Sequence, residues 1–433
     1  MTRTEFYSPL LKERYCRLDH ESGLQIYVFP KKLTTSYALL AARYGSLDRA
    51  VCVDGGAVEA FPDGVAHFLE HKLFDNADGS DAFERFSALG ADANAYTTYN
   101  RTAYLFSCTE HFAESLAELL SFVTHPHFTA SSVKKEQGII AEEIRMYDDM
   151  PWERVFQNLL CAMYREHPVR CNVCGTVASI REITPQLLYR AHMLFYALCN
   201  MVLVVCGDVD AEEICKISGR VLPAGRADAC RVERLIPTES TEVARSYVEA
   251  RMSVSKPIFS IGIKDDAPAK DPVTRARREF AMTLLNEVLF SQSGAFYHEL
   301  FEEGLITPSF AHGYSAEESF AFNCITGESD RPTEVLARFW TYVDRVMDEG
   351  LSDEDVERAR RVLYADEIRA YDSTEEIANR LLSFVLDGID MFDVPEWIRT
   401  VTRKELEELM RALYKRERVA LSVIYPSDGE GTE

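Results

Sequence analysis

Positive charge is scarce in this chain of 433 residues, in which 47 Lys and Arg face 70 Asp and Glu, for a net charge of −23. Such a field repels phosphate backbones, so we expect no nucleic-acid partner. It favours basic or neutral peptides, although solubility alone more often explains an acidic surface.

Long apolar runs are also missing. The longest, 193–206, is interrupted by Asn200 and is too short to span a bilayer, so we expect a helix end, a buried strand and no membrane partner.

The first twenty residues lack the apolar core and cleavage pattern of a secretory signal. The eleven cysteines are an odd number, scattered from Cys16 to Cys324. Both features predict reduced thiols and a cytoplasmic location. Cys171 and Cys174 form a C-x-x-C pair, but the sequence has neither a second pair at metal-site spacing nor a thioredoxin-like context. We interpret these two cysteines as incidental.

Residues 67–71 read His-Phe-Leu-Glu-His, and this stretch is the most informative in the chain. On a helix, His67 and His71 project from one face and can hold a single metal ion. Glu70 can point at the open position of that metal. This H-x-x-E-H order is that of the inverted zinc peptidases. The competing interpretation is an amphipathic helix with two surface histidines.

A third ligand is expected from a second element, because catalytic zinc usually takes three protein ligands and a water. Residues 133–147 have a helical pattern in which Glu136 and Glu143 lie two turns apart on one face. Glu142 is offset by about 100°. A carboxylate on this face would complete a His-His-Glu site for Zn²⁺, whereas the alternative for a Glu-rich helix is a solvated surface.

The chain resembles the pitrilysin/insulinase-type zinc metallopeptidases, and most of all their short bacterial members related to mitochondrial processing peptidase. The resemblance is dense over roughly 40–215 and thinner but colinear beyond. It is carried by DGVAHFLEHKLF (63–74), EQGIIAEEIRMYDDMP (136–151), GADANAYTTYNRTAYLF (90–106), HPVRCNVCGTVASIREIT (167–184) and NMVLVVCGDVD (200–210).

The resemblance implies a role for each residue of the site. Glu143 becomes the third zinc ligand beside His67 and His71, and Glu136 the carboxylate that supports them. Glu70 becomes the base that takes the proton of the zinc-bound water. Residues 92–99 become an edge strand that pairs with an extended substrate. The substrate-binding residues nearest the zinc are then Asn94, Ala95 and Tyr96, although taken alone this segment reads as a plain buried strand.

The order of predicted elements indicates an α+β fold made of two homologous halves, each an antiparallel-rich sheet covered by helices. The first half, 1–220, bears the zinc motif, residues 221–242 form a linker, and 243–433 repeats the order without the motif. In the first half we predict an antiparallel strand pair at 24–29 and 37–43, helices at 62–76, 79–89, 110–124, 133–150 and 152–165, and strands at 93–108 and 201–207. In the second half we predict strands at 245–251 and 257–264, a helix at 272–291, an edge strand at 319–326, helices at 331–349 and 352–371, and a strand at 418–424.

One stretch departs from the family pattern. The resembling peptidases carry an arginine and a tyrosine in the second half that position the substrate and stabilise the oxyanion. This chain has Phe301 at the arginine position, and Tyr314 is only a displaced substitute. An oxyanion-hole donor contributes about 3 kcal/mol. We therefore expect a homologous partner subunit that supplies the pair in a heterodimer, or else a homodimer in which Tyr314 or another arginine has taken over.

The sequence thus predicts a zinc endopeptidase that cleaves short or unfolded peptides in an enclosed chamber. The main alternative is a non-catalytic core or scaffold subunit of a peptidase-like heterodimer. A decayed subunit would be expected to have lost at least one of His67, Glu70, His71 and Glu143, and all four are present. A metal-dependent hydrolase acting on another substrate is a third, weaker interpretation.

Overall fold

The computed structural model describes residues 2–225, 230–265 and 269–427. They form two compact units, and each unit combines segments that lie far apart in the sequence. The first contains residues 1–144, 172–236 and 368–392, and the second contains 145–171, 237–367 and 393–433. None of the helices within the described ranges is both long enough and apolar enough to cross a membrane.

The first unit is built on a seven-stranded sheet whose central strand is the most apolar segment of the chain. That strand, β9 (Met201–Gly207), is buried at every position and runs parallel to β3 but antiparallel to β4. Such a continuous apolar run is typical of a strand covered on both faces. The strand order is β1 (Thr2–Ser8), β2 (Glu13–Asp19), β3 (Gln25–Pro30), β9, β4 (Ser36–Ala42), β8 (Thr102–Cys108) and β7 (Asp92–Thr97).

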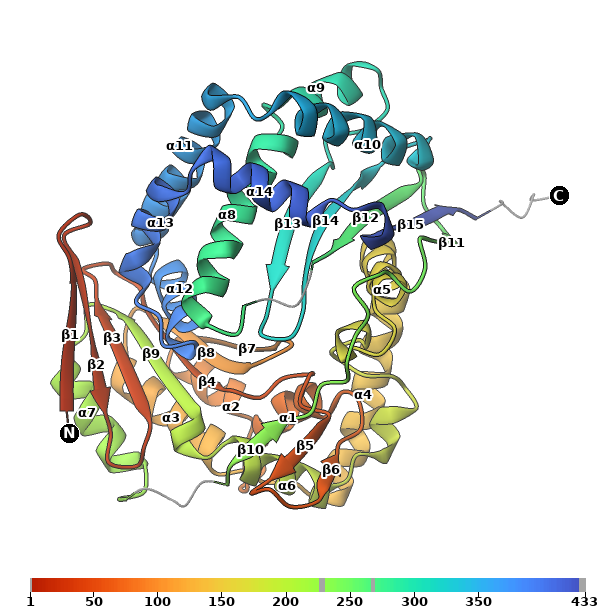
Figure 1. Cartoon of the computed structure of the whole chain (residues 1–433). Helices are drawn as coiled ribbons and strands as arrows, with labels where there is room; N and C mark the ends of the chain where they lie inside the picture. Colours follow the sequence, from red (N-terminus) through yellow and green to blue (C-terminus); the bar gives the residue numbers. More distant parts are fainter. Residues whose placement is uncertain (1, 226–229, 266–268, 428–433) are drawn as a thin grey trace. The chain divides into compact units, whose positions relative to one another are not determined.

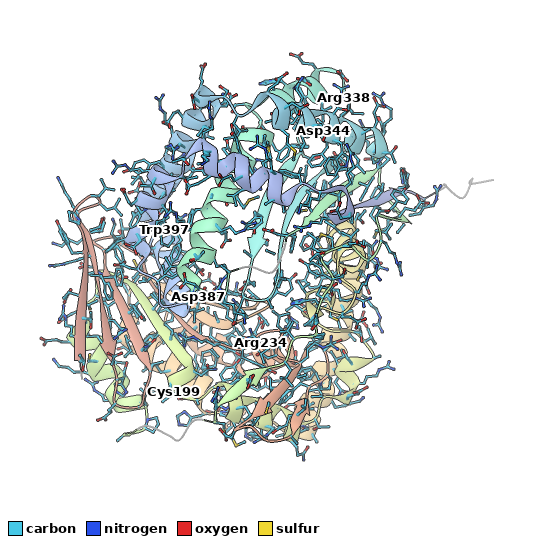
Figure 2. The ribbon with its side chains drawn as sticks, viewed as in Figure 1. Cys199, Arg234, Arg338, Asp344, Asp387 and Trp397 are labelled. Carbon is cyan, nitrogen blue, oxygen red and sulfur yellow. The ribbon has the colours of Figure 1, made fainter. Side chains whose placement is uncertain are left out.

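A smaller sheet joins β10 (Val232–Arg234), β5 (Ala50–Val53) and β6 (Val58–Ala60). Arg234, marked in Figure 2, pairs its guanidinium with the buried Asp48 carboxylate at 2.8 Å. This pair helps to hold β10 in place beside β5. The predicted linker 221–242 therefore contains a strand, while its residues 226–229 lie outside the described residues.

Two strand predictions in this unit are corrected. The strands at 24–29 and 37–43 do run in opposite directions, as β3 and β4, but they are not paired because β9 lies between them. The single strand predicted at 93–108 is a hairpin. Its arms are β7 and β8, and Thr98 N–H donates to the Arg101 carbonyl across the turn at 2.8 Å.

Helices cover both faces of this sheet. The last of them in sequence, α12, comes from the far end of the chain and packs Ile377 and Leu381 against the strand residues Tyr37 and Val204. The helices are α1 (Val65–Leu73), α2 (Ala82–Ala88), α3 (Phe112–Thr124), α4 (Ala130–Asp148), α6 (Pro185–Phe195), α7 (Ala211–Val221) and α12 (Thr374–Leu386).

The five-stranded sheet of the second unit repeats the order of the five strands from β3 to β7 in the first sheet. Its sheet runs β11 (Tyr247–Met252), β15 (Val419–Pro426), β12 (Ile258–Lys264), β14 (Ala321–Glu328), β13 (Ala311–Ala316). Here β15 is inserted between β11 and β12, parallel to the first and antiparallel to the second, as β9 is inserted between β3 and β4 in the first unit. This shared topology confirms two homologous halves. The predicted edge strand at 319–326 is wrong in position, because β14 is internal and β13 is the edge.

The helices of the second unit include one that the first half of the sequence contributes. Figure 1 shows α5 alongside the strands β12 and β15, which it contacts. The compact units therefore differ from the predicted contiguous domains 1–220 and 243–433. The helix α5, from the first half of the sequence, packs in the second unit, and α12, from the second half, packs in the first. The helices are α5 (Pro151–Met163), α8 (Pro272–Phe290), α9 (Ala295–Glu302), α10 (Pro332–Glu349), α11 (Asp353–Arg369), α13 (Val394–Thr400) and α14 (Arg403–Leu413). Short 3-10 helices are η1 (Pro168–Arg170), η2 (Ser179–Glu182), η3 (Leu198–Asn200), η4 (Ala370–Asp372), η5 (Met391–Asp393) and η6 (Arg416–Arg418).

Candidate metal centre

The H-x-x-E-H motif lies on α1, a short helix that is buried on nearly every face. Phe68 and Leu69 are fully buried, and the helix contacts β7 and β8. His67 and His71, four residues apart, bring their rings to a centroid separation of 4.6 Å. The packing of the apolar residues thus fixes the direction in which both imidazoles project.

Helix α4 supplies the facing carboxylate. Its buried residues Val133, Ile140 and Ile144 anchor it. Glu143 places one oxygen, Oε1, 3.5 Å from His67 Nε2, and the other, Oε2, 3.4 Å from His71 Nε2. Glu142 is exposed instead. The structure therefore places Glu143 against both predicted histidines, and the choice of Glu143 over Glu142 agrees with the geometry. The set of donor atoms that all lie within 4.8 Å of one another contains His67 and Glu143 but not His71.

The spacing and chemistry of these groups fit a metal ion. Two donors bound to zinc at about 2.0–2.1 Å with tetrahedral angles are roughly 3.3 Å apart, which is close to both measured separations. Such distances are long for ordinary N–H···O hydrogen bonds. Two imidazoles and a carboxylate are a donor set that zinc accepts.

Glu136 supports the site from the same face of α4. His71 Nδ1–H donates to Glu136 Oε1 at 3.1 Å, which leaves Nε2 as the lone-pair nitrogen that faces Glu143. The Lys72 ammonium, whose side chain is 1% exposed, lies 3.6 Å from Glu136 Oε2. Burial opposes ionisation of Glu136, but the His71 hydrogen bond and Lys72 outweigh it and lower the pKa of this carboxyl. For His71, burial is likewise outweighed by Glu136 and Glu143, and the pKa is raised.

Glu70 occupies an enclosed position next to the two histidines. It is 9% exposed and accepts a hydrogen bond from Thr97 Oγ1 at 2.5 Å. Burial raises the pKa of Glu70, partly offset by the histidines and Thr97. A raised carboxyl pKa suits a group that must take up and release a proton near neutral pH.

The predicted substrate-binding segment is the edge strand β7. Strand β7 pairs only with β8 in the sheet order, and Asn94 is exposed while Ala95 and Tyr96 are partly exposed. The Ala95 N–H donates to Asn94 Oδ1 at 2.9 Å, and Tyr96 Oη donates to Asn379 Oδ1 at 3.3 Å. An edge strand offers backbone groups to an added strand. Substrate binding at these three residues stays a prediction.

The structure adds one residue that the sequence had set aside. Cys174 Sγ lies 3.7 Å from His67 Nε2, and ligand atoms of His67, Glu143 and Cys174 all lie within 4.8 Å of one another. The interpretation of Cys174 as incidental is therefore incomplete. The C-x-x-C spacing held no signal for this contact, because it pairs residues 107 positions apart.

Comparison with known proteins identifies the family. The first half matches the description "Insulinase (Peptidase family M16)" over residues 46–177, and "Peptidase M16 inactive domain" matches residues 182–363. A protein of Bacillus subtilis named "Uncharacterized zinc protease YmfH" is 37% identical over 410 residues, covering 94% of this chain and 95% of its own length.

Solved structures agree with this assignment. A putative M16-like peptidase from Alicyclobacillus acidocaldarius has a TM-score of 0.91 at 35% identity, over 95% of this chain and 98% of that one. A protease from Helicobacter pylori shares the fold, with a TM-score of 0.79 at 17% identity over 96% of this chain and 100% of that one. The chain therefore belongs to the insulinase-type peptidase family M16, whose relatives here are named zinc proteases.

Proposed function

We propose that this protein is a zinc-dependent endopeptidase that cleaves short or unfolded peptides. The observation that carries the proposal is the set of three facing donors, in which Glu143 lies 3.5 Å and 3.4 Å from the Nε2 atoms of His67 and His71, with Glu70 on the same helix. A complete set of this kind is what hydrolysis requires, whereas a scaffold subunit has no need of it.

The residues divide the chemistry between them. When bound, zinc supplies a Lewis acid that polarises the scissile carbonyl and lowers the pKa of a water molecule. Glu70 takes the proton of that water and passes it to the leaving amine. Thr97 holds one Glu70 oxygen and thereby orients the carboxylate. Glu136 keeps the His71 ring in one tautomer.

The peptide is expected to bind in an extended form. Strand β7 lies at the edge of the first sheet and carries Thr97, the residue that contacts Glu70. A substrate added beside β7 would therefore run past the base. For the Ala95 N–H to join this pairing, Asn94 must first release it. Enclosure of the substrate in a chamber belongs to the same proposal.

The experiment that tests this function compares neighbouring acidic residues. We expect the purified chain to hold zinc and to cleave an unstructured peptide, to lose cleavage with a chelator and to regain it with added zinc. Glu143→Gln should lose both zinc and cleavage, while Glu142→Gln, one residue away and exposed, should keep both. Cleavage that survives complete zinc removal would contradict the proposal.

A partner chain is part of the proposal, because the described residues of the second half offer no evident oxyanion group. Phe301, at the expected arginine position, is 43% exposed. The Tyr314 hydroxyl donates to Asp265 Oδ2 at 2.6 Å, and Arg278 binds the same carboxylate. Tyr314 is thus engaged within its own unit, which favours a heterodimer over a homodimer that uses Tyr314.

The solution mass and cleavage rate of the isolated chain, measured before and after addition of a homologous chain bearing the arginine and tyrosine, test this assembly. We expect the partner to raise the rate by about a hundredfold, the effect of one oxyanion-hole donor. A fully active homodimer that Tyr314→Phe inactivates would overturn it.

A further inference from the structure

Cys174 lies on a turn that is pressed against the start of α1. Gly64, the residue before α1, and Gly175 both have positive φ, at 91° and 77°. A Cβ on Gly64 would come 2.4 Å from the Cys174 carbonyl oxygen, and one on Gly175 would come 2.4 Å from the Asp63 carbonyl oxygen. Only glycine permits this backbone approach. The position of Cys174 relative to His67, one helical turn from Gly64, is therefore fixed by packing.

Hydrogen bonds hold the same turn. The Cys174 N–H donates to Asn172 Oδ1 at 2.9 Å, and the Gly175 N–H donates to the Asn172 carbonyl at 2.9 Å. Ser179 Oγ donates to the Asp63 carbonyl at 2.7 Å, which ties the following segment to α1. These hydrogen bonds hold the backbone of the turn, and with it the Cα of Cys174, beside the start of α1.

The thiol is enclosed beside the predicted ligands. Cys174 is 7% exposed, and its Sγ lies 3.7 Å from His67 Nε2. A sulfur and an imidazole nitrogen bound to one zinc at about 2.3 Å and 2.0–2.1 Å, at tetrahedral angles, are roughly 3.6 Å apart. The measured distance matches this value. Glu143, the carboxylate ligand of the proposed site, belongs to the same cluster of donor atoms. His71 is not part of that cluster and reaches it through Glu143, whose Oε2 lies 3.4 Å from His71 Nε2.

We propose that Cys174 is a fourth protein ligand to the zinc, an inference that rests on the metal site of the proposed function. Its thiolate would occupy the position otherwise open to water, giving a closed resting state with His67, His71 and Glu143. Structural zinc sites have four protein ligands and catalytic sites keep one position open, so the thiolate would have to yield its position to water or substrate in each cleavage cycle of the proposed peptidase. The thiol proton passes to solvent when the metal–sulfur bond forms, and no electron is transferred.

Cobalt substitution tests the inference without any measurement of cleavage. Co²⁺ bound to the full-length chain should show a near-ultraviolet sulfur-to-cobalt charge-transfer band. Cys174→Ser should abolish this band and weaken zinc binding by at least about tenfold, since even groups that only orient a ligand contribute that much. Cys171→Ser, the other cysteine of the same C-x-x-C pair, is the matched control and should keep both the band and the affinity.

X-ray absorption of the zinc-loaded native chain gives a second measurement that needs no variant. We expect one sulfur neighbour at about 2.3 Å. A first shell of nitrogen and oxygen alone, or a cobalt band that survives Cys174→Ser, would overturn the role of Cys174 while leaving the zinc site intact. A native chain that binds no metal would instead overturn the proposed function, and this inference with it.

Discussion

The two homologous halves share one strand order but satisfy their buried polar groups in opposite ways. In the second half, the helix α8 buries Asn286 against Asn323 of β14. The two amides exchange hydrogen bonds of 2.8 Å in both directions, and Asn323 also donates to Tyr414 Oη at 3.0 Å. The polar groups at this contact between α8 and β14 are paired by the protein's own side chains.

In the first half, the helix α1 presents two histidines whose Nε2 atoms face Glu143 at more than ordinary hydrogen-bond distance. Glu143 stays 3.4–3.5 Å from both Nε2 atoms, which is long for an ordinary N–H···O hydrogen bond. A zinc ion among these three groups could bind the two nitrogens and the carboxylate at ordinary ligand distances. The comparison indicates that a duplicated scaffold keeps one polar cluster for stability and the other for a metal.

The largest effect is expected at the base of the first half. Glu70→Gln keeps the shape of the side chain but cannot take a proton, so cleavage should fall by about 10²–10⁴-fold while zinc is retained. Steady-state kinetics and metal analysis of the same sample check this. Near-native turnover would show that Glu70 is not the base, and loss of zinc would make it a ligand.

The next effect concerns a buried charge pair of the second unit. Glu239 accepts hydrogen bonds from Lys264 Nζ at 2.8 Å and from the backbone N–H groups of Arg165, Glu166 and His167. Glu239→Gln leaves the Lys264 ammonium, 3% exposed, without its countercharge. We expect a loss of about 3–5 kcal/mol in the free energy of unfolding, measured with urea. Glu242→Gln, exposed and nearby, is the control and should change stability little.

The same pair predicts a pH dependence. Burial opposes ionisation of Glu239, but Lys264 and the backbone donors lower its pKa from 4.5 to about 2. A carboxyl whose folded pKa is depressed stabilises the native state above its unfolded pKa and loses that contribution as the pH falls. The native chain should therefore lose stability between about pH 4.5 and 2, and Glu239→Gln should flatten this part of the profile. An unchanged slope in the variant would contradict the assignment.

A smaller effect is expected from the asparagine pair. Asn286→Leu leaves Asn323 with an unsatisfied amide and should cost about 1–3 kcal/mol, while Asn286→Leu combined with Asn323→Leu should cost less than the two single changes added together. A double-mutant cycle of urea unfolding measures the coupling. Simple additivity of the two changes in the free energy of unfolding would mean that Asn286 and Asn323 do not stabilise each other.

The smallest effect is expected at Thr97. Its hydroxyl favours the ionised form of Glu70, so Thr97→Val should raise the pKa of that carboxyl further. The acid limb of the pH profile of kcat/KM should then move to higher pH, with only a few-fold loss at the optimum. Thr97→Ser, which keeps the hydroxyl, should restore the native profile. An unmoved acid limb in the valine variant would show that Thr97 does not influence the ionisation of Glu70.

The sequence predicts those elements whose local pattern is strong. The buried strand 201–207 is predicted at its observed bounds, and α1 and α8 are predicted within a few residues, because apolar periodicity determines them. The pairing of β3 with β9, about 175 residues apart, could not be predicted, since register across a sheet depends on distant strands. The packing of α5 in the second unit and of α12 in the first also depends on contacts between distant segments, which no local pattern encodes.

The site follows the same division. His67, Glu70 and His71 are one local motif, so residue types and spacing suffice to predict them. Spacing placed Glu136 and Glu143 on one helix face, and only the family resemblance singled out Glu143 as the ligand. Cys174 was missed because its approach to His67 depends on the contact of two glycines, Gly64 and Gly175, in different segments. No spacing within the sequence encodes that contact.

The most direct test of the central claim is anomalous diffraction at the zinc edge from crystals of the native chain. The account predicts one zinc ion within about 2.0–2.2 Å of His67 Nε2, His71 Nε2 and a Glu143 oxygen. A zinc ion bound elsewhere in the chain, with these three side chains uncoordinated, would contradict it.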